Sequence, residues 1–238
     1  MIRLFGQAQF SIANKKLSGY ELFLREQKVP GGPWRLPENI AGIDPKLMTA
    51  LLEQTLVALP AGLDFVAFNL DESQFVQSDY FDLLTHLAAE LPFQLGIELT
   101  ERHGDEAVEV TVDELIEAAS HYQSSGLVVC LDDVGTGENV QSLVTALDPY
   151  VSEYKYALQN IRKQSTPEQL VSTVNYWRNR AKRLHKRFTL EGLESHEDRA
   201  LIRQFLPDYV QGYYFGTPHQ LVLVEELDPD LHDDASCM

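Results

Sequence analysis

Residues 65–99 read FVAFNLDESQFVQSDYFDLLTHLAAELPFQLGIEL, and this stretch contains one complete strand–helix–strand unit. Phe65–Leu70 and Phe93–Leu99 are short apolar segments typical of strands, whereas Tyr80–Glu90 has apolar residues at helical spacing. Two strands joined by a helix of this length normally run parallel in one sheet. The stretch therefore predicts an α/β fold built on parallel strands.

The same alternation continues on both sides of this unit. Further strands are predicted at Arg3–Ile12, Leu17–Arg25, Leu127–Asp132, Val151–Tyr156, Phe188–Leu190 and Tyr209–Phe215. Further helices are predicted at Pro45–Leu59, Val112–Gln123, Asn139–Ala146, Pro167–Leu184 and His196–Phe205. The loops are short, so the sheet is expected to be a closed barrel or doubly wound. The first two strands follow each other directly, which indicates that one strand departs from the parallel pattern.

The composition excludes several classes of protein. The chain has 238 residues, with 36 acids against 19 bases and a formal net charge of −17, which argues against electrostatic binding to a nucleic-acid polymer or an anionic membrane. No apolar run approaches the roughly 18 residues of a membrane span. Cys130 and Cys237 are too few for a disulfide framework, so we expect a cytoplasmic protein.

Acidic residues gather at the C-terminal end of the chain. Residues 225–234 contain no base and these acids: Glu225, Glu226, Asp228, Asp230, Asp233 and Asp234. We expect residues 1–224 to form one barrel domain and residues 225–238 to form a mobile acidic tail.

Carboxylates lie at the ends of most predicted strands. They are Glu21, Glu98, Glu101, Asp132, Asp133, Glu191 and Glu194, and Asn69 and Lys155 accompany them. Each one alone has an ordinary interpretation as a surface residue, but in a barrel all the carboxyl ends of parallel strands meet at one mouth. So many carboxylates repel one another unless divalent cations bind, and oxygen ligands favour Mg²⁺, Mn²⁺ or Ca²⁺ over zinc. Two such ions about 4 Å apart suit in-line displacement at phosphorus.

A series of motifs resembles the EAL domain family of cyclic di-GMP phosphodiesterases, in order over about residues 3–218. The motifs are Glu21-Leu22-Phe23-Leu24-Arg25, Phe68-Asn69-Leu70, Glu98-Leu99-Thr100-Glu101, Leu131-Asp132-Asp133-Val134-Gly135-Thr136-Gly137, Lys155, Glu191-Gly192-Leu193-Glu194 and Gln211-Gly212-Tyr213-Tyr214-Phe215. The resemblance implies a modified TIM (β/α)₈ barrel with one antiparallel strand. It also implies hydrolysis of cyclic di-GMP to linear pGpG by a metal-activated water.

The resemblance further implies two Mg²⁺ or Mn²⁺ ions held by residues at the matching positions. The implied ligands of the first ion are Glu21, Asn69, Glu98 and Asp132. The second ion would lie around Asp132 and Asp133, with Glu191 nearby.

The remaining positions take supporting roles in the same comparison. Lys155 would hold the water or stabilise charge on the phosphate, with Glu191 beside it. Glu101 would brace the loop after Asp133, and Gln211 would support the site. Arg25 and its neighbour Leu24 are the expected substrate-binding residues, because a guanidinium suits bidentate pairing with phosphate.

The chain departs from the family pattern at several positions. The alanine and leucine of the signature are Leu22 and Phe23, which we expect to face the barrel wall, and the aspartate after the family's lysine is Ala157. Two hypotheses follow. One is an active or weakened phosphodiesterase; the other is a degenerate EAL domain that binds cyclic di-GMP or a protein partner without turnover. In either case we expect a stand-alone domain, and relatives of this kind commonly form homodimers.

Overall fold

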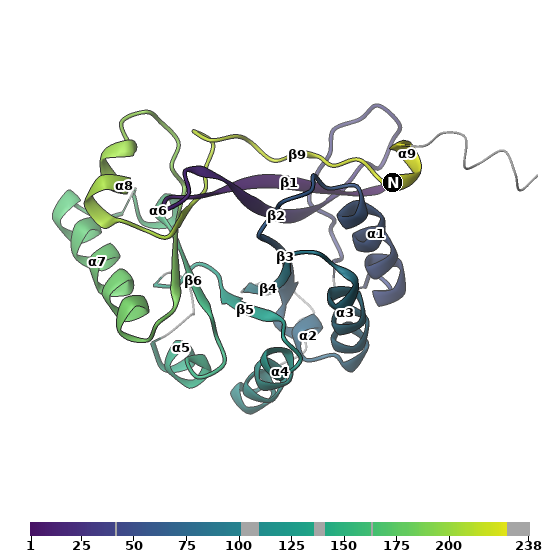
Figure 1. Cartoon of the computed structure of the whole chain (residues 1–238), viewed down its shortest axis with the longest axis horizontal. Helices are drawn as coiled ribbons and strands as arrows, with labels where there is room; N and C mark the ends of the chain where they lie inside the picture. The colour runs from purple at the N-terminus through teal and green to yellow at the C-terminus, as the bar shows by residue number, and fades with distance from the viewer. Residues whose placement is uncertain (41, 101–109, 136–140, 163, 228–238) are drawn as a thin grey trace, which may run out of the picture.

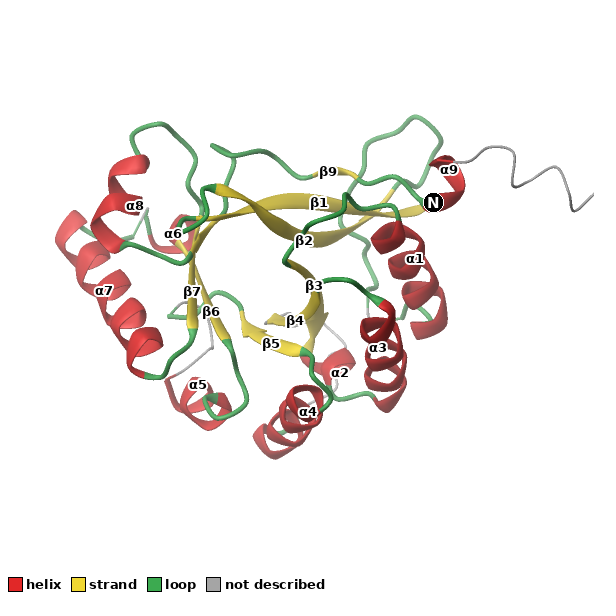
Figure 2. Cartoon of the chain, in the orientation of Figure 1, coloured by secondary structure: helices red, strands yellow, loops and turns green. Residues whose placement is uncertain are grey.

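Eight strands close into a ring at the centre of the molecule, and helices surround it (Figure 1). The computed structural model describes the whole chain except residues 41, 101–109, 136–140, 163 and 228–238. The ring strands in this part of the chain are β1 (Ile2–Ser11), β2 (Lys16–Glu26), β3 (Phe65–Asp71), β4 (Gln94–Thr100), β5 (Val128–Leu131), β6 (Glu153–Ala157), β7 (Arg187–Glu191) and β8 (Tyr209–Val210). Figure 2 shows the ring of strands with the helices outside it.

Strand β1 is the one that runs against the others in the ring. Neighbours from β2 to β8 pair in parallel, whereas β1 pairs antiparallel with both β2 and β8 and so closes the barrel. A short strand, β9 (His219–Gln220), pairs antiparallel with the outer part of β1. The expected modified barrel with one antiparallel strand is confirmed.

The helices begin where the sequence provides capping groups. They are α1 (Pro45–Val57), α2 (Glu72–Phe75), α3 (Ser78–Glu90), α4 (Val112–Ser124), α5 (Gln141–Leu147), α6 (Leu158–Ile161), α7 (Pro167–Arg183), α8 (Arg199–Phe205) and α9 (Val224–Leu227). Asp44 caps α1 through the backbone N–H of Lys46, with Pro45 in the first turn. Reciprocal capping boxes open α4 and α7, at Thr111 and Thr166 respectively.

The main core lies between the strands and the helices, and a smaller cluster fills part of the barrel. Side chains alternate along each strand, so Leu22 and Leu24 of β2 join the outer core while Glu21 points the other way. Inside the barrel, Phe65, Ala67, Val128 and Cys130 form a small apolar cluster. The rest of the interior is lined by polar side chains, whereas the interior of such a barrel is normally packed with apolar ones. This polar lining indicates where a functional site lies.

The last part of the chain differs most from expectation. The predicted strand Tyr209–Phe215 ends at Val210, because the backbone then turns beneath the loop after β7. Gly212 has φ 150°, and a Cβ at this position would lie 2.2 Å from Leu193 O, so only glycine fits the turn. The helix predicted at His196–Phe205 begins only at Arg199, since the Asp198 carboxylate instead holds the backbone N–H groups of the preceding loop.

The short elements α2, α6, β9 and α9 were not predicted from the sequence. Helix α9 includes the first residues of the predicted acidic tail, and an ion pair of 3.0 Å between Arg3 and Glu226 joins it to β1. The rest of that tail lies outside the described residues. In the described parts of the chain, no helix is both long enough and apolar enough to cross a membrane.

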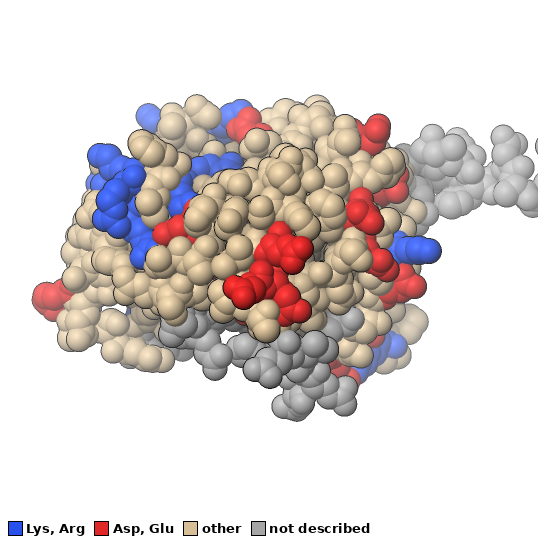
Figure 3. All heavy atoms as spheres, turned by 90° about the horizontal axis from the view of Figure 1, so that it is seen from below, with Lys and Arg blue, Asp and Glu red and all other residues tan. Residues whose placement is uncertain are grey.

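Surface charge is unevenly distributed over the helices (Figure 3). Seen from this side, Asp and Glu side chains gather in the region of α4, and Lys and Arg side chains gather in the region of α7. Helix α7 ends in Arg180, Lys182 and Arg183, which are favourable at a helix C-terminus. Arg180 is nevertheless buried, with its Nη2 2.7 Å from Asp148 Oδ2, so part of this basic end is an internal ion pair.

Candidate active site

Lys155 lies at the centre of a group of acidic side chains inside the barrel. Its side chain is completely buried. Its Nζ atom is 2.8 Å from Glu21 Oε2, 2.7 Å from Glu98 Oε2 and 2.7 Å from Glu191 Oε1. Asp132 Oδ1 is farther away, at 3.9 Å. The barrel therefore brings together four predicted site acids from four strands or strand ends around one buried cation.

The long hairpin of β1 and β2 determines where Glu21 lies. Strand β2 pairs with β3 only from Gly19 to Leu22, and beyond that it continues with β1 alone. Glu21 is therefore near the end of the barrel-forming part of β2, although it is in the middle of the strand. Two amides hold its carboxylate: Asn69 Nδ2 donates to Oε1 at 3.0 Å and Gln211 Nε2 donates to Oε2 at 2.6 Å.

Gln7 of β1 extends this amide network and was not predicted from the sequence. Its Oε1 accepts a hydrogen bond of 3.1 Å from Gln211 Nε2, and its own Nε2 donates to Gly216 O at 2.9 Å. Gln7 is opposite Glu21 in the β1–β2 register. Gln7 matches the glutamine of the family's first-strand Gln-Pro-Ile pattern, but only the antiparallel pairing shows that it lies beside Glu21.

The turn after β5 carries Asp132 and Asp133. The Asp133 backbone N–H donates to Asp132 Oδ1 at 2.9 Å, and the Val134 N–H donates to Lys155 O at 3.0 Å. Asp133 has φ 51°, a left-handed conformation that aspartate tolerates better than most residues. The turn thus aligns two consecutive carboxylates beside the strand that carries Lys155.

Burial and mutual repulsion shift the pKa values of these acids in different directions. Burial raises the pKa values of Glu98 and Glu191 well above their ordinary range. Burial also acts to raise the pKa of Glu21, but Lys155 and the hydrogen bonds from Asn69 and Gln211 lower it overall. Burial would lower the pKa of Lys155, yet the surrounding carboxylates raise it well above its usual value. One buried ammonium therefore does not balance all the acids, and the others favour protons.

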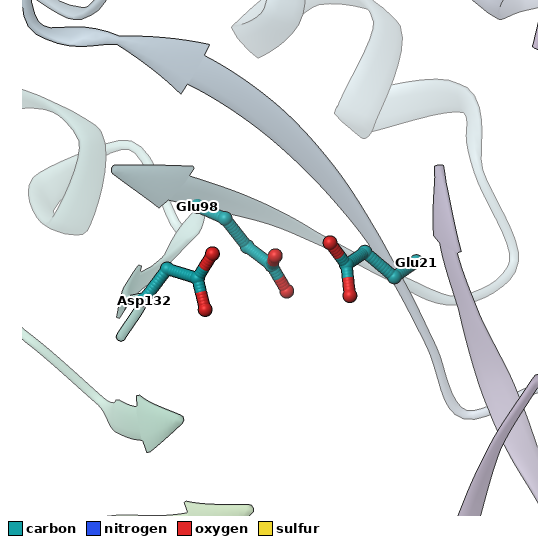
Figure 4. A group of neighbouring side chains, drawn as sticks. All are labelled: Glu21, Glu98 and Asp132. Carbon is teal, nitrogen blue, oxygen red and sulfur yellow. The ribbon is translucent and has the colours of Figure 1, made fainter. Parts of the chain in front are cut away.

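These residues fit a hard divalent cation. Oxygen atoms of Glu21, Glu98 and Asp132 all lie within 4.8 Å of one another, and Figure 4 shows the three side chains converging on a common space. Glu98 Oε1 is buried and has no hydrogen-bond partner among the described residues. An acceptor without a donor at this place is suited to a metal ion, and a purely oxygen donor set favours ions such as Mg²⁺, Mn²⁺ or Ca²⁺.

Asp132 is expected to make the stability of the metal-free protein depend on pH. Burial is the main cause that raises its pKa from 3.8 to about 7 in the folded state, so folding favours the protonated form. This contribution to stability is fully present below the pKa that Asp132 has in the unfolded chain. It is lost as the pH rises through the folded-state pKa of about 7. We expect the Tm measured by calorimetry without metal to fall between about pH 4 and 7, and Asp132→Asn to reduce this fall. The same fall in both proteins would contradict the assignment.

The predicted substrate-binding residues lie on the projecting part of β2. Arg25 stands over the Phe23 ring at 5.4 Å, and its Nη1 donates to Leu24 O at 2.9 Å. Leu24 packs in the outer core, so its side chain lies on the opposite face from Glu21. Leu22 faces the wall as expected, whereas Phe23 does not, because strand alternation places it on the face of Glu21 and Arg25.

Three other positions complete the comparison with the sequence. Glu101 lies outside the described residues. Glu194 is exposed in the loop after β7, and its backbone N–H donates to Asp198 Oδ2 at 2.8 Å, so its side chain is not part of the buried group. Ala157 is buried opposite Glu191 in the β6–β7 register and adds no ligand there.

Comparisons with known proteins identify the family and the fold. The family model described as EAL domain matches residues 2–218. The chain is similar to the EAL enzyme Bd1971 in its form with cAMP and cyclic di-GMP (21% identity, TM-score 0.73, 95% of this chain and 63% of that chain). It is also similar to the PaMucR phosphodiesterase in complex with cyclic di-GMP (18% identity, TM-score 0.72, 95% of this chain and 99% of that chain).

A third similar structure is the Bacillus subtilis YkuI protein with substrate cyclic di-GMP and calcium (18% identity, TM-score 0.72, 93% of this chain and 57% of that chain). At these identities the likeness shows the fold, and no match is found among curated proteins. The chain spans slightly less than two thirds of the length of the Bd1971 protein. Because the family model covers nearly the whole chain, the chain belongs to the EAL domain family.

Proposed function

We propose that this protein hydrolyses cyclic di-GMP to linear pGpG with the help of two divalent ions, Mg²⁺ or Mn²⁺. The observation that carries the proposal is the convergence of Glu21, Glu98 and Asp132 on one space beside the buried Lys155. An arrangement with more carboxylates than cations is costly without metal, and it provides ligands for hard ions. The similarity to the PaMucR phosphodiesterase in complex with cyclic di-GMP supports the choice of substrate.

The ligands of the first ion would be Glu21, Asn69, Glu98 and Asp132, and those of the second would be Asp132 and Asp133, with Glu191 nearby. Asn69 donates to Glu21 through Nδ2, which leaves its amide oxygen as the atom to offer to an ion. Bound divalent ions would supply a water of lowered pKa and would neutralise charge on the phosphate.

The protein's own groups would position the reactants. Lys155, kept charged by its carboxylate neighbours, would hold the attacking water or stabilise negative charge on the phosphate. Gln211 would keep the Glu21 carboxylate in place, and Glu101 would brace the loop after Asp133. Arg25, at the end of the projecting hairpin, would pair with a phosphate of the substrate.

The reaction is a hydrolysis without a redox step. Water adds its hydroxyl to one phosphorus atom, the bond from that phosphorus to a ribose 3′ oxygen breaks, and the 3′ oxygen takes up the proton. The product retains one phosphodiester and gains a terminal phosphate.

One observation favours a second function. Ala157 is buried beside Glu191, at the position where the family pattern has an aspartate, so one carboxylate is missing near the second ion. A site weakened in this way would bind cyclic di-GMP, or a protein partner, without turnover.

Incubation of the purified protein with cyclic di-GMP and Mn²⁺ or Mg²⁺ distinguishes the two functions. We expect pGpG to form, as followed by liquid chromatography, and a chelator to abolish its formation because the carboxylates require metal. Asp132→Asn serves as the inactive control. Binding of cyclic di-GMP without any pGpG after several hours would contradict hydrolysis and support the regulatory alternative.

A further inference from the structure

The turn that follows β5 is held on two sides by parts of the chain outside the acidic group. It begins at Asp132, one of the carboxylates that converge on the candidate metal position, and it reaches Gly135. On one side, the Val134 N–H donates to Lys155 O at 3.0 Å, and the Val134 side chain is completely buried in the core. The place of the Asp132 carboxylate therefore depends on how firmly this short turn is fixed to its surroundings.

Trp177 of α7 holds the turn on its other side. Helix α7 packs against β6 on the outside of the barrel (Figure 1). Its indole is so close to Gly135 that a Cβ at this position would lie 2.2 Å from Trp177 Nε1 and 3.0 Å from Cε2. Gly135 also has φ 86°, a left-handed conformation that favours glycine. The bare glycine backbone therefore rests directly on the indole ring.

The indole itself has little freedom to move. Trp177 is 4% exposed, and the rings of Tyr154 and Tyr176 make T-shaped contacts with it at centroid distances of 5.8 and 5.3 Å. The Arg180 guanidinium lies 5.6 Å from the ring centroid and is fixed by its own ion pair of 2.7 Å. Tyr154 directly precedes Lys155 in β6, so the strand that carries the central lysine also supports the indole. The ring therefore provides a rigid surface for the turn.

We propose that Trp177 is a positioning residue that keeps the Asp132 carboxylate in the place needed to bind a divalent ion. It acts through the backbone of the turn and need not touch the ion or the substrate. The inference rests on the proposed function, because the metal ion belongs to it. Removing a group that orients a metal ligand typically weakens metal binding by about 10–100-fold, so the contribution of the indole is measurable.

Calorimetric titration of the full chain with Mn²⁺ tests the proposal without measuring hydrolysis. Trp177→Leu removes the flat ring beside Gly135 and should weaken the binding of Mn²⁺ by about 10–100-fold. Trp177→Phe keeps an aromatic ring at the same place and should recover most of the affinity. The Tm of each variant, measured with a chelator, records any loss of stability separately from the loss of metal binding.

Tyr122→Leu is the matched control for the loss of a buried ring. Tyr122 of α4 has no exposed surface and packs in the outer core against Phe75 and Phe81, at centroid distances of 4.9 and 5.4 Å. This variant should lower the Tm as Trp177→Leu does, but it should bind Mn²⁺ as the wild type does. The proposal is wrong if Trp177→Leu binds Mn²⁺ normally, or if both variants lose affinity equally.

Gly135→Ala tests the same contact from the side of the turn. In the wild type the added Cβ meets the indole at 2.2 Å and displaces the turn, so the affinity for Mn²⁺ should fall. In Trp177→Leu the indole is absent, and the same substitution should cost less because only the strain of alanine at φ 86° is left. Two losses that simply multiply in the double variant would overturn the proposal, since residues in direct contact are coupled.

Formation of pGpG by the wild type separates this inference from the proposed function. An affinity for Mn²⁺ that depends on Trp177, together with no formation of pGpG, would refute hydrolysis and leave the inference intact. Formation of pGpG by a protein whose affinity for Mn²⁺ does not depend on Trp177 would refute the inference alone.

Discussion

Replacing Lys155 by methionine is expected to destabilise the metal-free protein by about 3–5 kcal/mol, because the change leaves buried carboxylates without their cation. The Lys155 ammonium contacts Glu21, Glu98 and Glu191 at 2.7–2.8 Å, with no exposed surface of its own. Methionine fills a similar volume, so the loss of charge dominates over the loss of packing. Urea unfolding in the presence of a chelator measures the effect.

Divalent metal should reverse much of this loss. In Lys155→Met, an ion bound by the carboxylates replaces the missing positive charge, so Mn²⁺ should raise the Tm more than it does in the wild type. Even with metal, the rate of hydrolysis by Lys155→Met should stay at least about 100-fold below that of the wild type, because the variant lacks the preorganised positive group at the phosphate.

Lys16→Met is the control for this prediction. Lys16 makes an exposed ion pair with Asp64 at 3.3 Å, and such pairs contribute at most about 1 kcal/mol. If Lys155→Met were no less stable than Lys16→Met, the carboxylates would have to be fully protonated around Lys155 in the wild type. The central role given to this lysine would then be wrong.

The barrel was predictable because its strands and helices have clear local signals. The unit from Phe65 to Leu99 has the expected strand–helix–strand order, and Asp44 and Pro45 begin α1 as their residue types indicate. The segment after Val210 was not predictable, because its apolar residues are also typical of a strand. The close approach of Gly212 to Leu193, far away in the sequence, is what bends it.

The candidate site was predictable only in part. Strand-end carboxylates meet at one mouth in any parallel barrel, so Glu98 and Asp132 follow from the fold class alone. The direct contact of Lys155 with three carboxylates depends on how far each strand is shifted around the barrel, which no local pattern encodes. Gln7 acts on the site across the β1–β2 pairing, so its role is identified only in three dimensions.

The ion pair of Glu153 and Arg187 is another feature of the barrel that could not be predicted from the sequence. Glu153 is a fully buried acid two residues before Lys155, and it was not singled out from the sequence. Its Oε2 lies 3.2 Å from Arg187 Nε, and Thr189 donates to its other oxygen. A buried acid inside the barrel is therefore not by itself a metal ligand, because this one is already balanced by its own cation.

Glu21→Gln is expected to weaken binding of the first metal ion by more than about 100-fold and to lower hydrolysis by about a thousandfold. Glu21 accepts hydrogen bonds from Lys155, Asn69 and Gln211, so every neighbour presents a donor. Glutamine has the same shape but brings its own donor group into this set, and at least one N–H must then face another. The variant loses both the ligand charge and the arrangement that holds it.

Glu153→Gln separates this local effect from general damage to the barrel. It also removes a buried negative charge, and it should destabilise the fold because Arg187 loses its partner. Its affinity for Mn²⁺ should nevertheless stay close to that of the wild type, since Glu153 is bound to Arg187 and Thr189 and not to the acidic group. Equal loss of metal in both variants would mean that barrel stability, and not Glu21, controls binding. Loss confined to Glu21→Gln would identify this carboxylate as a ligand.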